Sequence, residues 1–257
     1  MSDRAPSPSR ARGRAGARAR SADALADAPA STRSREPLDR TQVLAAALAL
    51  VDARGLDALS MRRLGEVLGC DPMSIYRYTP NREALLDGVV ELVMEELVIP
   101  TDRQDWQQAL RASAHDFRRL ALAHPHVAPL LVTRPLSTPL GRRPLGTLRP
   151  LEQVLALLVG AGFAPADALH VHRAYDSFVT GHVLGELQEL VVDPQESDDL
   201  LRLGLHRLPR QEFPHLRGLA SALAGYDGAA ELDQGLDILL SGLRAQLDAD
   251  HDRRGGA

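Results

Sequence analysis

The sequence contains no lysine, a single cysteine and few aromatic residues, and these shortages exclude several classes of protein. Cys70 alone cannot form an internal disulfide framework or a multi-cysteine metal site, and it suits a reducing cytoplasm, where we expect the protein to act. Aromatic residues make up 4% of the chain and isoleucine is almost absent, whereas alanine and leucine dominate. Because this composition favours helices over strands, we expect an all-α fold.

Long hydrophobic runs are also missing. The longest uninterrupted apolar stretches, residues 44–51 and 154–164, fall short of the roughly 18 residues that a bilayer span needs, so we expect no membrane partner. The chain has 257 residues, of which 44% are hydrophobic and 25% charged, and this is enough to bury the core of one large or two modest domains.

The charge of the chain changes along its length. The formal net charge of -4 would by itself argue against nucleic acid as a partner. However, residues 1–40 carry nine arginines against five acidic residues, whereas residues 41–98 carry five against nine. The first segment is rich in Arg, Ala, Ser and Pro without apolar periodicity, so we expect residues 1–36 to be a disordered tail, either simply solvated or also touching DNA phosphates.

Apolar residues with helical spacing begin at Leu38. Gly55 and Gly69 are expected to end the first two helices, and Asp71-Pro72 has the order of an N-cap followed by proline at the first helical position. The four helices expected here are residues 41–54, 61–68, 72–78 and 81–98.

A larger helical domain is expected after the first. We assign residues 37–98 to the first domain and residues 99–250 to the second, because Pro100 interrupts the helical pattern. The second domain contains apolar stretches of helical spacing separated by proline and glycine. The helices expected in it are residues 104–123, 126–132, 147–161, 165–191, 196–206, 214–224 and 229–249. We expect the proline-rich run over residues 134–150 to be irregular.

The second and third helices have the layout of a helix-turn-helix. Both are short, a glycine separates them, and the later one begins with Asp-Pro and carries Ser, Tyr and Arg. Gly65 provides a small residue where the two helices would cross. The positions expected to face inward are Leu64, Leu68, Cys70, Ile75 and Tyr78. A compact helical hairpin without a role in DNA binding is the alternative that this pattern leaves open.

Several runs of residues resemble one known family. They are Leu38-Asp39-Arg40, Gly55 through Leu64, Asp71 through Tyr78 and Asn81 through Asp87. This part resembles the DNA-binding domain of the tetracycline-repressor (TetR) family, in the branch closest to the tetracycline repressor. Looser similarity to the regulatory domain of that branch includes Asp105-Trp106-Gln107, Phe117-Arg118, Thr133-Arg134-Pro135, Gly162-Phe163 and Gly235 through Leu243. The resemblance covers residues 38–249.

The resemblance implies an all-helical homodimer that acts as a transcriptional repressor. Its N-terminal helix-turn-helix domains would enter successive major grooves of a palindromic double-stranded DNA operator. Its larger C-terminal helical domains would dimerise and bind a small-molecule effector that releases the operator. The resemblance implies neither an enzyme nor a cofactor.

Eight residues are candidates for DNA contact, from their place in the helix-turn-helix and from the resemblance. Arg77 can donate two hydrogen bonds to guanine O6 and N7, and Met73 can pack on a thymine methyl group. Tyr76 is expected to reach a phosphate. The full set is Arg62, Pro72, Met73, Ser74, Tyr76, Arg77, Tyr78 and Arg82.

Six residues are candidates for effector binding, and Ser113 and Phe117 correspond by resemblance to pocket-lining positions of the tetracycline repressor. The full set is Trp106, Ser113, Phe117, Leu131, Arg134 and Phe178. The sequence also departs from that repressor. Leu130 and Leu131 stand where it has its magnesium-coordinating histidine, and Gly185 stands where a glutamate is expected. We therefore expect a largely apolar effector, no metal site and no magnesium–tetracycline complex.

Residues 165–191 and 229–249 have broad apolar faces with small residues, which are typical of a four-helix interface between two protomers. The candidate interface residues are Phe178, Gly181, Leu184, Leu236, Leu239 and Leu243. Packing inside one protomer is the alternative. His182 and Glu186 have the i, i+4 spacing of a metal-binding pair, but we interpret His182 as an interface residue rather than a ligand.

Two other functions compete with the repressor. A helical enzyme is disfavoured, because the sequence has no Gly-rich phosphate loop, nucleophile elbow or metal-ligand cluster. A DNA-binding or architectural protein that ignores small molecules is the closer alternative. The length of the second domain argues against it, because DNA binding alone does not require that domain.

Overall fold

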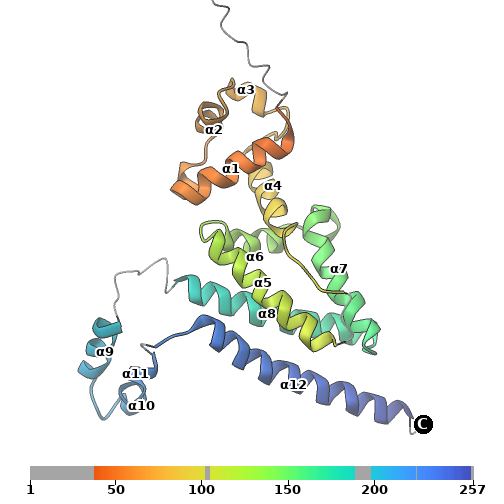
Figure 1. Cartoon of the computed structure of the whole chain (residues 1–257), viewed down its shortest axis with the longest axis vertical. Helices are drawn as coiled ribbons and strands as arrows, with labels where there is room; N and C mark the ends of the chain where they lie inside the picture. The colour runs from red at the N-terminus through yellow and green to blue at the C-terminus, as the bar shows by residue number, and fades with distance from the viewer. Residues whose placement is uncertain (1–37, 102–104, 189–197, 224, 256–257) are drawn as a thin grey trace, which may run out of the picture. The chain divides into compact units, whose positions relative to one another are not determined.

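The computed structural model describes residues 38–101, 105–188, 198–223 and 225–255. The expected tail, residues 1–36, lies outside them. Every regular element in the described residues is helical, which confirms the all-α prediction (Figure 1). The helices are α1 (Arg40–Arg54), α2 (Met61–Leu68), α3 (Pro72–Ile75), α4 (Arg82–Met94), α5 (Trp106–Ala123), α6 (Ala128–Ser137), α7 (Leu145–Gly160), α8 (Pro165–Leu187), α9 (Asp198–Arg207), α10 (Pro214–Gly218), α11 (Ala220–Leu223) and α12 (Gly228–Gly255), with the 3-10 helices η1 (Leu56–Ala58) and η2 (Leu140–Arg142).

The packing of α1 against α4 forms the core of the N-terminal helices. Asp39 begins α1 with a capping box: its Oδ1 accepts a hydrogen bond from Gln42 N at 2.7 Å, and Gln42 Oε1 accepts one from Asp39 N at 3.2 Å. The two helices approach closely at Gly88, where a Cβ atom would lie 2.6 Å from Leu44 Cδ2. Helix α2 packs on α1 and on α3, so this core supports the helix-turn-helix.

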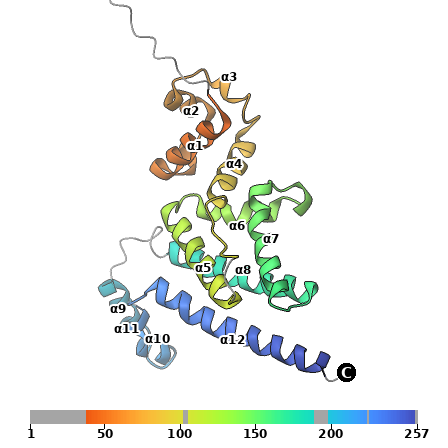
Figure 2. The ribbon, with the colours of Figure 1, turned by 45° about the vertical axis from the view of Figure 1, so that its right-hand side comes forward.

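The C-terminal helices pack around α5 and α8. Helix α5 contacts α6, α7, α8 and α12, and α8 contacts α5, α6, α7 and α12 (Figure 2). The apolar side chains between these helices are fully or almost fully buried and include Leu110, Leu120, Val154, Leu158, Val179, Leu232 and Leu236. These helices line the cavity described below.

Helices α6 and α7 correct one expectation from the sequence. Residues 134–150 are largely helical rather than irregular, and Pro135 and Pro150 lie inside α6 and α7. A proline removes one backbone hydrogen bond from a helix. Here both helices pack against α4, α5 and α8, and these tertiary contacts outweigh the low helix propensity of proline.

A buried ion pair joins α5 to the last turn of α8. Arg118 donates two hydrogen bonds to Glu186, from Nε to Oε2 at 2.8 Å and from Nη2 to Oε1 at 2.5 Å. The Glu186 side chain is only 3% exposed. Helix α12 begins directly beside it, because a Cβ atom on Gly228 would overlap the Glu186 carboxylate. The pair therefore holds the start of α12 near the end of α8.

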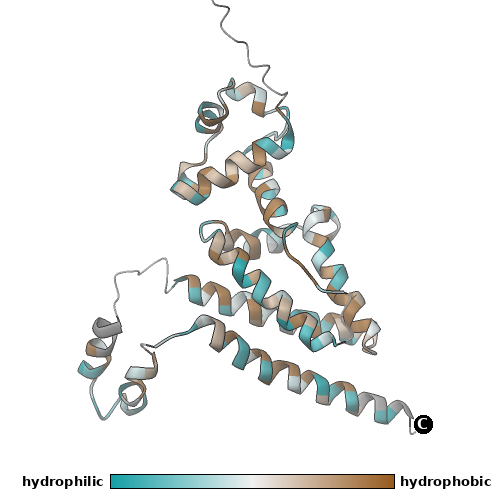
Figure 3. Cartoon of the chain, in the orientation of Figure 1, coloured by the Kyte–Doolittle hydropathy of each residue, from teal (hydrophilic) through white to brown (hydrophobic). Residues whose placement is uncertain are grey.

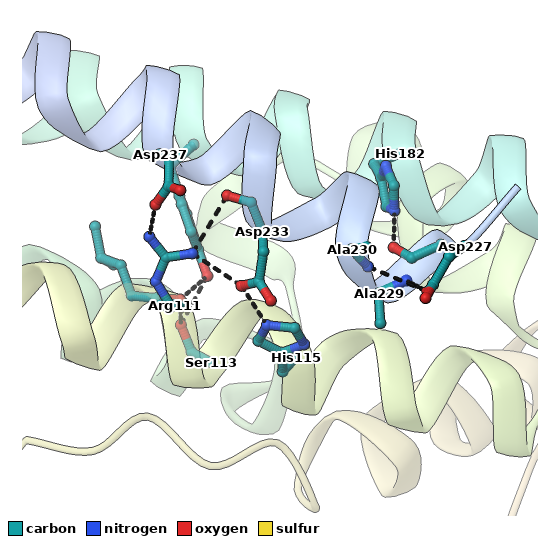
Figure 4. Close-up of polar contacts among 12 residues, drawn as sticks. Arg111, Ser113, His115, His182, Asp227, Ala229, Ala230, Asp233 and Asp237 are labelled. Atoms are coloured by element: carbon teal, nitrogen blue, oxygen red, sulfur yellow. Dashed lines mark hydrogen bonds and ion pairs between the residues drawn. The ribbon is translucent and has the colours of Figure 1, made fainter. Parts of the chain in front are cut away.

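Further polar contacts attach α12 to α5 (Figure 4). Arg111 Nη1 donates to Asp233 Oδ1 at 2.8 Å, Arg111 Nη2 donates to Asp237, and His115 Nε2 lies 2.9 Å from the same Asp233 oxygen. Hydrogen bonds from His115, and then from Arg111, lower the pKa of the Asp233 carboxyl group below its ordinary value. These contacts lie beside the row of buried leucines on α12. Hydrophobic and hydrophilic residues alternate along the helix as a whole (Figure 3).

Helix α12 is the longest of the described helices, with 28 residues. Charged residues recur along its whole length. Within the described parts of the chain, no helix has the length and hydropathy needed to cross a membrane.

Candidate DNA-binding surface and effector cavity

Local sequence signals define the turn between α2 and α3. Ser60 caps α2 by accepting a hydrogen bond from Arg63 N at 3.2 Å, and Gly69 ends it with φ 61° and ψ 37°, a left-handed conformation that glycine adopts without strain. Asp71 then caps α3 by accepting from Met73 N at 2.8 Å, with Pro72 at the first helical position. Only three residues, Gly69 to Asp71, therefore separate the end of α2 from the start of α3.

The two helices cross at Gly65. A Cβ atom there would lie 2.9 Å from the backbone oxygen of Cys70 and 3.1 Å from Pro72 Cγ. The backbones are thus too close for any larger residue at this position. Cys70 itself is half-buried.

We expect Gly65→Ala to lower the free energy of unfolding by about 1–3 kcal/mol, because the added methyl group meets backbone that cannot move independently. Urea denaturation measures the effect. Gly160→Ala is the matched control, since a Cβ atom at that helical glycine would meet no atom within 4 Å. A Gly65→Ala protein as stable as the Gly160→Ala protein would contradict the close crossing.

Helix α3 is shorter than the sequence predicts. It ends at Ile75 rather than Tyr78, and the chain continues as hydrogen-bonded turns, with Tyr78 N donating to Ile75 O at 2.9 Å. The side chain of Ile75 is fully buried and anchors this segment. The turns leave the outer residues of the segment facing solvent.

Most of the eight candidate DNA-contact residues are at least partly accessible to solvent. Met73 is 70% exposed, Tyr76 is 43% exposed and the side chain of Arg62 is 83% exposed. Arg77 is exposed and, among the described residues, its guanidinium makes no hydrogen bond or ion pair. The half-buried members are Pro72, Ser74 and Tyr78.

Arg82 differs from the other candidates because its guanidinium already contacts the backbone. Its Nη2 donates to Leu56 O at 3.1 Å and its Nε donates to Leu59 O at 3.4 Å. The side chain therefore joins the start of α4 to the segment before α2. A phosphate contact by Arg82 could use the N–H groups that these two bonds leave free, which are on its terminal nitrogens.

A cavity of about 270 Å³ lies among α4, α5, α6, α7 and α8. Three of the six candidate effector residues line it: Ser113 and Phe117 from α5 and Leu131 from α6. The other lining residues are Met94, Leu97, Ile99, Val132, Pro135, Arg143, Thr147, Pro150, Leu151, Val154, His172, Tyr175, Asp176, Ser177, Val179 and Thr180. Most of the wall is apolar, as expected for a small-molecule site.

The remaining three candidates lie outside the cavity lining. Trp106 is buried edge-on against the Phe163 ring, at 5.4 Å between centroids, with Arg244 over its face. The Phe178 ring packs on Gly235 of α12, where a Cβ atom would lie 2.2 Å from Phe178 Cζ. Arg134 points to α4 instead. These side chains stabilise the packing of helices around the cavity rather than forming its wall.

Arg134 connects α6 to α4. Its Nε donates to Asp87 Oδ1 at 2.7 Å, its Nη1 to Glu83 Oε2 at 3.0 Å and its Nη2 to Glu83 O at 2.9 Å. The next residue, Pro135, lines the cavity. A shift of α6 caused by the cavity's contents would therefore be transmitted directly to α4.

The two carboxylates that bind Arg134 belong to an acidic row, Glu83, Asp87, Glu91 and Glu95, spaced four residues apart along α4 and its C-cap. Arg40 Nη2 lies 3.1 Å from Glu91 Oε2, and Gly146 N donates to Glu91 Oε1 at 3.3 Å. Arg149 Nη1 lies 3.7 Å from Glu95 Oε1. Each carboxylate of the acidic row thus has a partner on α1, α6 or α7.

The candidate dimer residues divide into two groups. Leu236 is fully buried and Leu243 is 8% exposed within the single chain, because α12 packs on α5 and α8, so these two belong to the protomer's own core and not to an outer face. Gly181 is exposed, and Phe178, Leu184 and Leu239 are half-buried. His182 Nε2 donates to Gly228 O at 2.8 Å, so its hydrogen bond is internal to the chain.

The outward face of α12 contains residues that the sequence did not single out. Ile238 is 79% exposed, although it lies between the buried Leu236 and Leu240. A Cβ atom on Gly242, one turn later, would meet nothing within 4 Å. The sequence signal for this face was Ile238 itself, an apolar residue out of phase with the leucine stripe.

Two segments of the chain match known families. Residues 43–89 match the family described as bacterial regulatory proteins, tetR family. Residues 99–247 match the tetracyclin repressor-like, C-terminal domain. The first match contains α2, α3 and most of α1 and α4, and the second contains the helices that line most of the cavity.

Individual proteins show the same similarity. An HTH-type transcriptional regulator of Saccharopolyspora erythraea is 31% identical over 216 residues, which are 83% of this chain and 88% of that protein. The tetracycline repressor protein class C of Escherichia coli is 30% identical over 214 residues, 80% of this chain and 90% of the repressor. The crystal structure of the Streptomyces coelicolor TetR family protein ActR in complex with actinorhodin has a TM-score of 0.70 at 30% identity, covering 82% of this chain and 99% of that one.

Proposed function

Because the chain belongs to the tetR family of bacterial regulatory proteins, we propose that it is a homodimeric repressor released from a palindromic operator by a small, largely apolar molecule. The observation that carries this proposal is the contact of Arg134 on α6 with Glu83 and Asp87 on α4. It joins a helix of the cavity wall to the helix that follows the helix-turn-helix.

Exposed side chains of the helix-turn-helix have the hydrogen-bonding groups that DNA binding requires. The guanidinium of Arg77 is exposed and makes no hydrogen bond or ion pair among the described residues, and Met73 and Tyr76 are exposed on the same segment. An arginine fork reads guanine in the major groove, while Tyr76 and Arg62 suit phosphate contacts. The N-terminus of α4 at Asn81 adds backbone N–H groups that favour a phosphate.

The cavity, and the ligand bound by a related protein, support effector binding. The cavity is enclosed mainly by apolar side chains, so burial of apolar surface would supply most of the binding free energy. ActR is a relative whose structure holds actinorhodin. An effector that contacts Leu131, Val132 and Pro135 would bias the position of α6, and through Arg134 that of α4.

Dimerisation would use the outward faces of α8 and α12. Gly181 on α8 and Gly242 on α12 leave room for close approach of a second helix, and Ile238 supplies an exposed apolar contact. Two such helices from each protomer make a four-helix interface. A two-fold symmetric dimer then presents two helix-turn-helix units to two half-sites.

Fluorescence anisotropy with the DNA upstream of the chain's own gene tests the proposal. At about 0.15 M salt we expect the full chain to bind one duplex at least about a thousandfold more tightly than a shuffled duplex of the same composition. Equal affinity for both duplexes would refute a repressor function.

A second arm separates the repressor from a DNA-binding protein that ignores ligands. Val132→Phe adds volume inside the cavity on α6 and imitates an occupied site, so the repressor should lose operator affinity while keeping its helical circular dichroism signal. A substitution of the same kind outside the cavity, Val159→Phe, is the control, because Val159 is 44% exposed on α7. Unchanged operator affinity in the Val132→Phe protein would favour the ligand-independent alternative.

A further inference from the structure

One wall of the cavity is polar while the others are apolar. Helices α4, α5 and α6, with the segment that follows α4, contribute mainly Met, Leu, Ile, Phe and Val side chains. Arg143, just before α7, and His172 and Asp176 on α8 provide the ionisable groups of the lining. The cavity is therefore amphipathic, and its polar wall must be matched by any ligand that fills it.

Most hydroxyl groups of the lining already have partners. The hydroxyls of Ser113 and Tyr175 lie 2.7 Å apart, and each is within hydrogen-bonding distance of Leu110 O. Burial raises the pKa of the Tyr175 phenol, so it stays neutral. Thr147 donates to Pro144 O at 2.8 Å, and Thr180 donates to Asp176 O at 2.6 Å. A ligand gains little by contacting these groups.

The ionisable groups, by contrast, are available. Arg143 uses only Nε, which donates to Thr138 O at 3.0 Å. Among the described residues, its two terminal nitrogens and the Asp176 carboxylate have no hydrogen-bond partner. His172 Nδ1 is shielded from solvent and likewise unpaired. For the buried His172 Nδ1, a missing partner costs free energy that a ligand could recover. Asp176 is exposed and Arg143 is half-buried, so these two groups are accessible to a ligand that enters the cavity.

The charges of this wall are opposite and close enough to interact. Partial burial raises the pKa of the Asp176 carboxyl group, and the nearby Arg143 guanidinium opposes this rise by electrostatic attraction. The two side chains nevertheless form no direct ion pair in the described residues. Burial lowers the pKa of His172 below its ordinary value of 6.5, so the imidazole is neutral at pH 7. A ligand group between Arg143 and Asp176 thus faces one positive and one negative charge.

This arrangement discriminates between head groups. A carboxylate would gain from Arg143 but would be repelled by Asp176, and an ammonium group would meet the reverse. A neutral group with an acceptor next to a donor satisfies both: its oxygen accepts from Arg143 and its N–H or O–H donates to Asp176. Neither Arg143 nor Asp176 then faces a ligand charge of its own sign.

We propose that the cavity selects an uncharged amphipathic ligand, with an apolar body of about two fused rings and a polar end that places a hydrogen-bond acceptor on Arg143 and a donor on Asp176. The size of the body follows from the volume of about 270 Å³, just below the roughly 300–1,000 Å³ of small-molecule sites. The proposal rests on the effector-binding function proposed above and specifies the class of effector.

Three probes of nearly identical shape test this selection by isothermal titration calorimetry on the full chain. They are 2-naphthamide, which is neutral with adjacent acceptor and donor, 2-naphthoate, which is an anion, and 2-naphthylmethylammonium, which is a cation. We expect 2-naphthamide to bind at least about tenfold more tightly than either ion, because each ion meets a charge of its own sign on the polar wall.

Two variants should change the order of affinities in opposite directions. Asp176→Asn removes the repulsion of anions, so 2-naphthoate should bind more tightly to this variant than to the parent chain. Arg143→Gln should do the same for 2-naphthylmethylammonium. Glu152→Gln and Arg142→Gln are matched controls, since both residues are exposed and lie outside the cavity lining. Misfolding would change the affinities for all three probes together, whereas the proposal expects a gain for only one ion in each variant.

Each calorimetric result either supports or contradicts the proposed ligand class. The tenfold preference with both gains supports the proposal. An ion that binds as tightly as the amide, variants that behave like their controls, or no binding of any probe at millimolar concentration each overturns it. Operator binding by the same samples without probe is measured in parallel, so that failure of the proposed repressor function is recognised separately.

Discussion

Replacing Arg77 by alanine is expected to weaken binding to the specific operator on the order of 5- to 150-fold per half-site, equivalent to about 1–3 kcal/mol. The physical reason is the loss of a forked donor whose guanidinium is exposed and makes no competing contact among the described residues. Fluorescence anisotropy with specific and shuffled duplexes measures both affinities. The loss should be large on the specific duplex and small on the shuffled one.

The control for Arg77 is another exposed arginine outside the helix-turn-helix. Arg210 is exposed in a turn between α9 and α10, so Arg210→Ala removes the same charge without changing the candidate DNA surface. An equal loss on both duplexes in the Arg77→Ala protein would mean that Arg77 contacts phosphates and does not read bases. The salt dependence would then flatten by about one unit of slope.

Replacing Arg118 by methionine is expected to lower the free energy of unfolding by about 3–5 kcal/mol. Glu186 is 3% exposed and would keep a buried negative charge without its two hydrogen bonds from Arg118. The nearest remaining cationic candidate, His182, lies 4.0 Å from it and already donates to Gly228 O. Urea denaturation at one fixed protein concentration measures the loss, because a dimer's stability depends on concentration.

The double variant Arg118→Met with Glu186→Met identifies the cause. Replacing both partners of a buried pair by apolar side chains of similar size removes the unpaired charge, so most of the lost stability should return. If the double variant is no more stable than Arg118→Met alone, the loss comes from packing rather than from charge. A loss below about 1 kcal/mol in the single variant would mean that water reaches the pair.

The helices could be predicted well from the sequence, because their signals are local. Ser60, Asp71 and Asn81 each cap the helix that the sequence places after them, and Gly55 and Gly69 end the helices before them. Caps and glycine stops act within one turn of chain, so no knowledge of the tertiary structure is needed. The all-α class follows from the same signals.

The errors arose where tertiary packing decides. Pro135 and Pro150 sit inside helices that neighbours hold in place, and the short extent of α3 depends on the turn after Ile75. The sequence left open whether the leucine stripe of α12 faces a partner chain or the core of its own protomer, and Leu236 is completely buried within the single chain, where α12 packs on α5 and α8. Hydrophobic periodicity identifies the buried face of a helix but not what buries it.

The candidate effector site was predictable only in part. Ser113, Phe117 and Leu131 were identified through the resemblance, and they do line the cavity. Arg143, His172 and Asp176 were missed, because their importance lies in what surrounds them and in the hydrogen bonds they lack. A charged residue in a sequence is usually solvated, and only the fold reveals one that faces a cavity.

The acidic row of α4 has a consequence for how easily the protein could switch. In each of its ion pairs with Arg134, Arg40 and Arg149, at least one partner is 42% or more exposed, and pairs that water reaches contribute only about 0–1 kcal/mol each. Together they resist a movement of α4 by an amount comparable to the 1–3 kcal/mol of a typical allosteric coupling. Breaking them therefore requires only a modest ligand preference, and dissolved salt weakens them alongside the DNA contacts. Ionic strength would act on this regulator as a second, non-specific signal that works in the same direction as its effector.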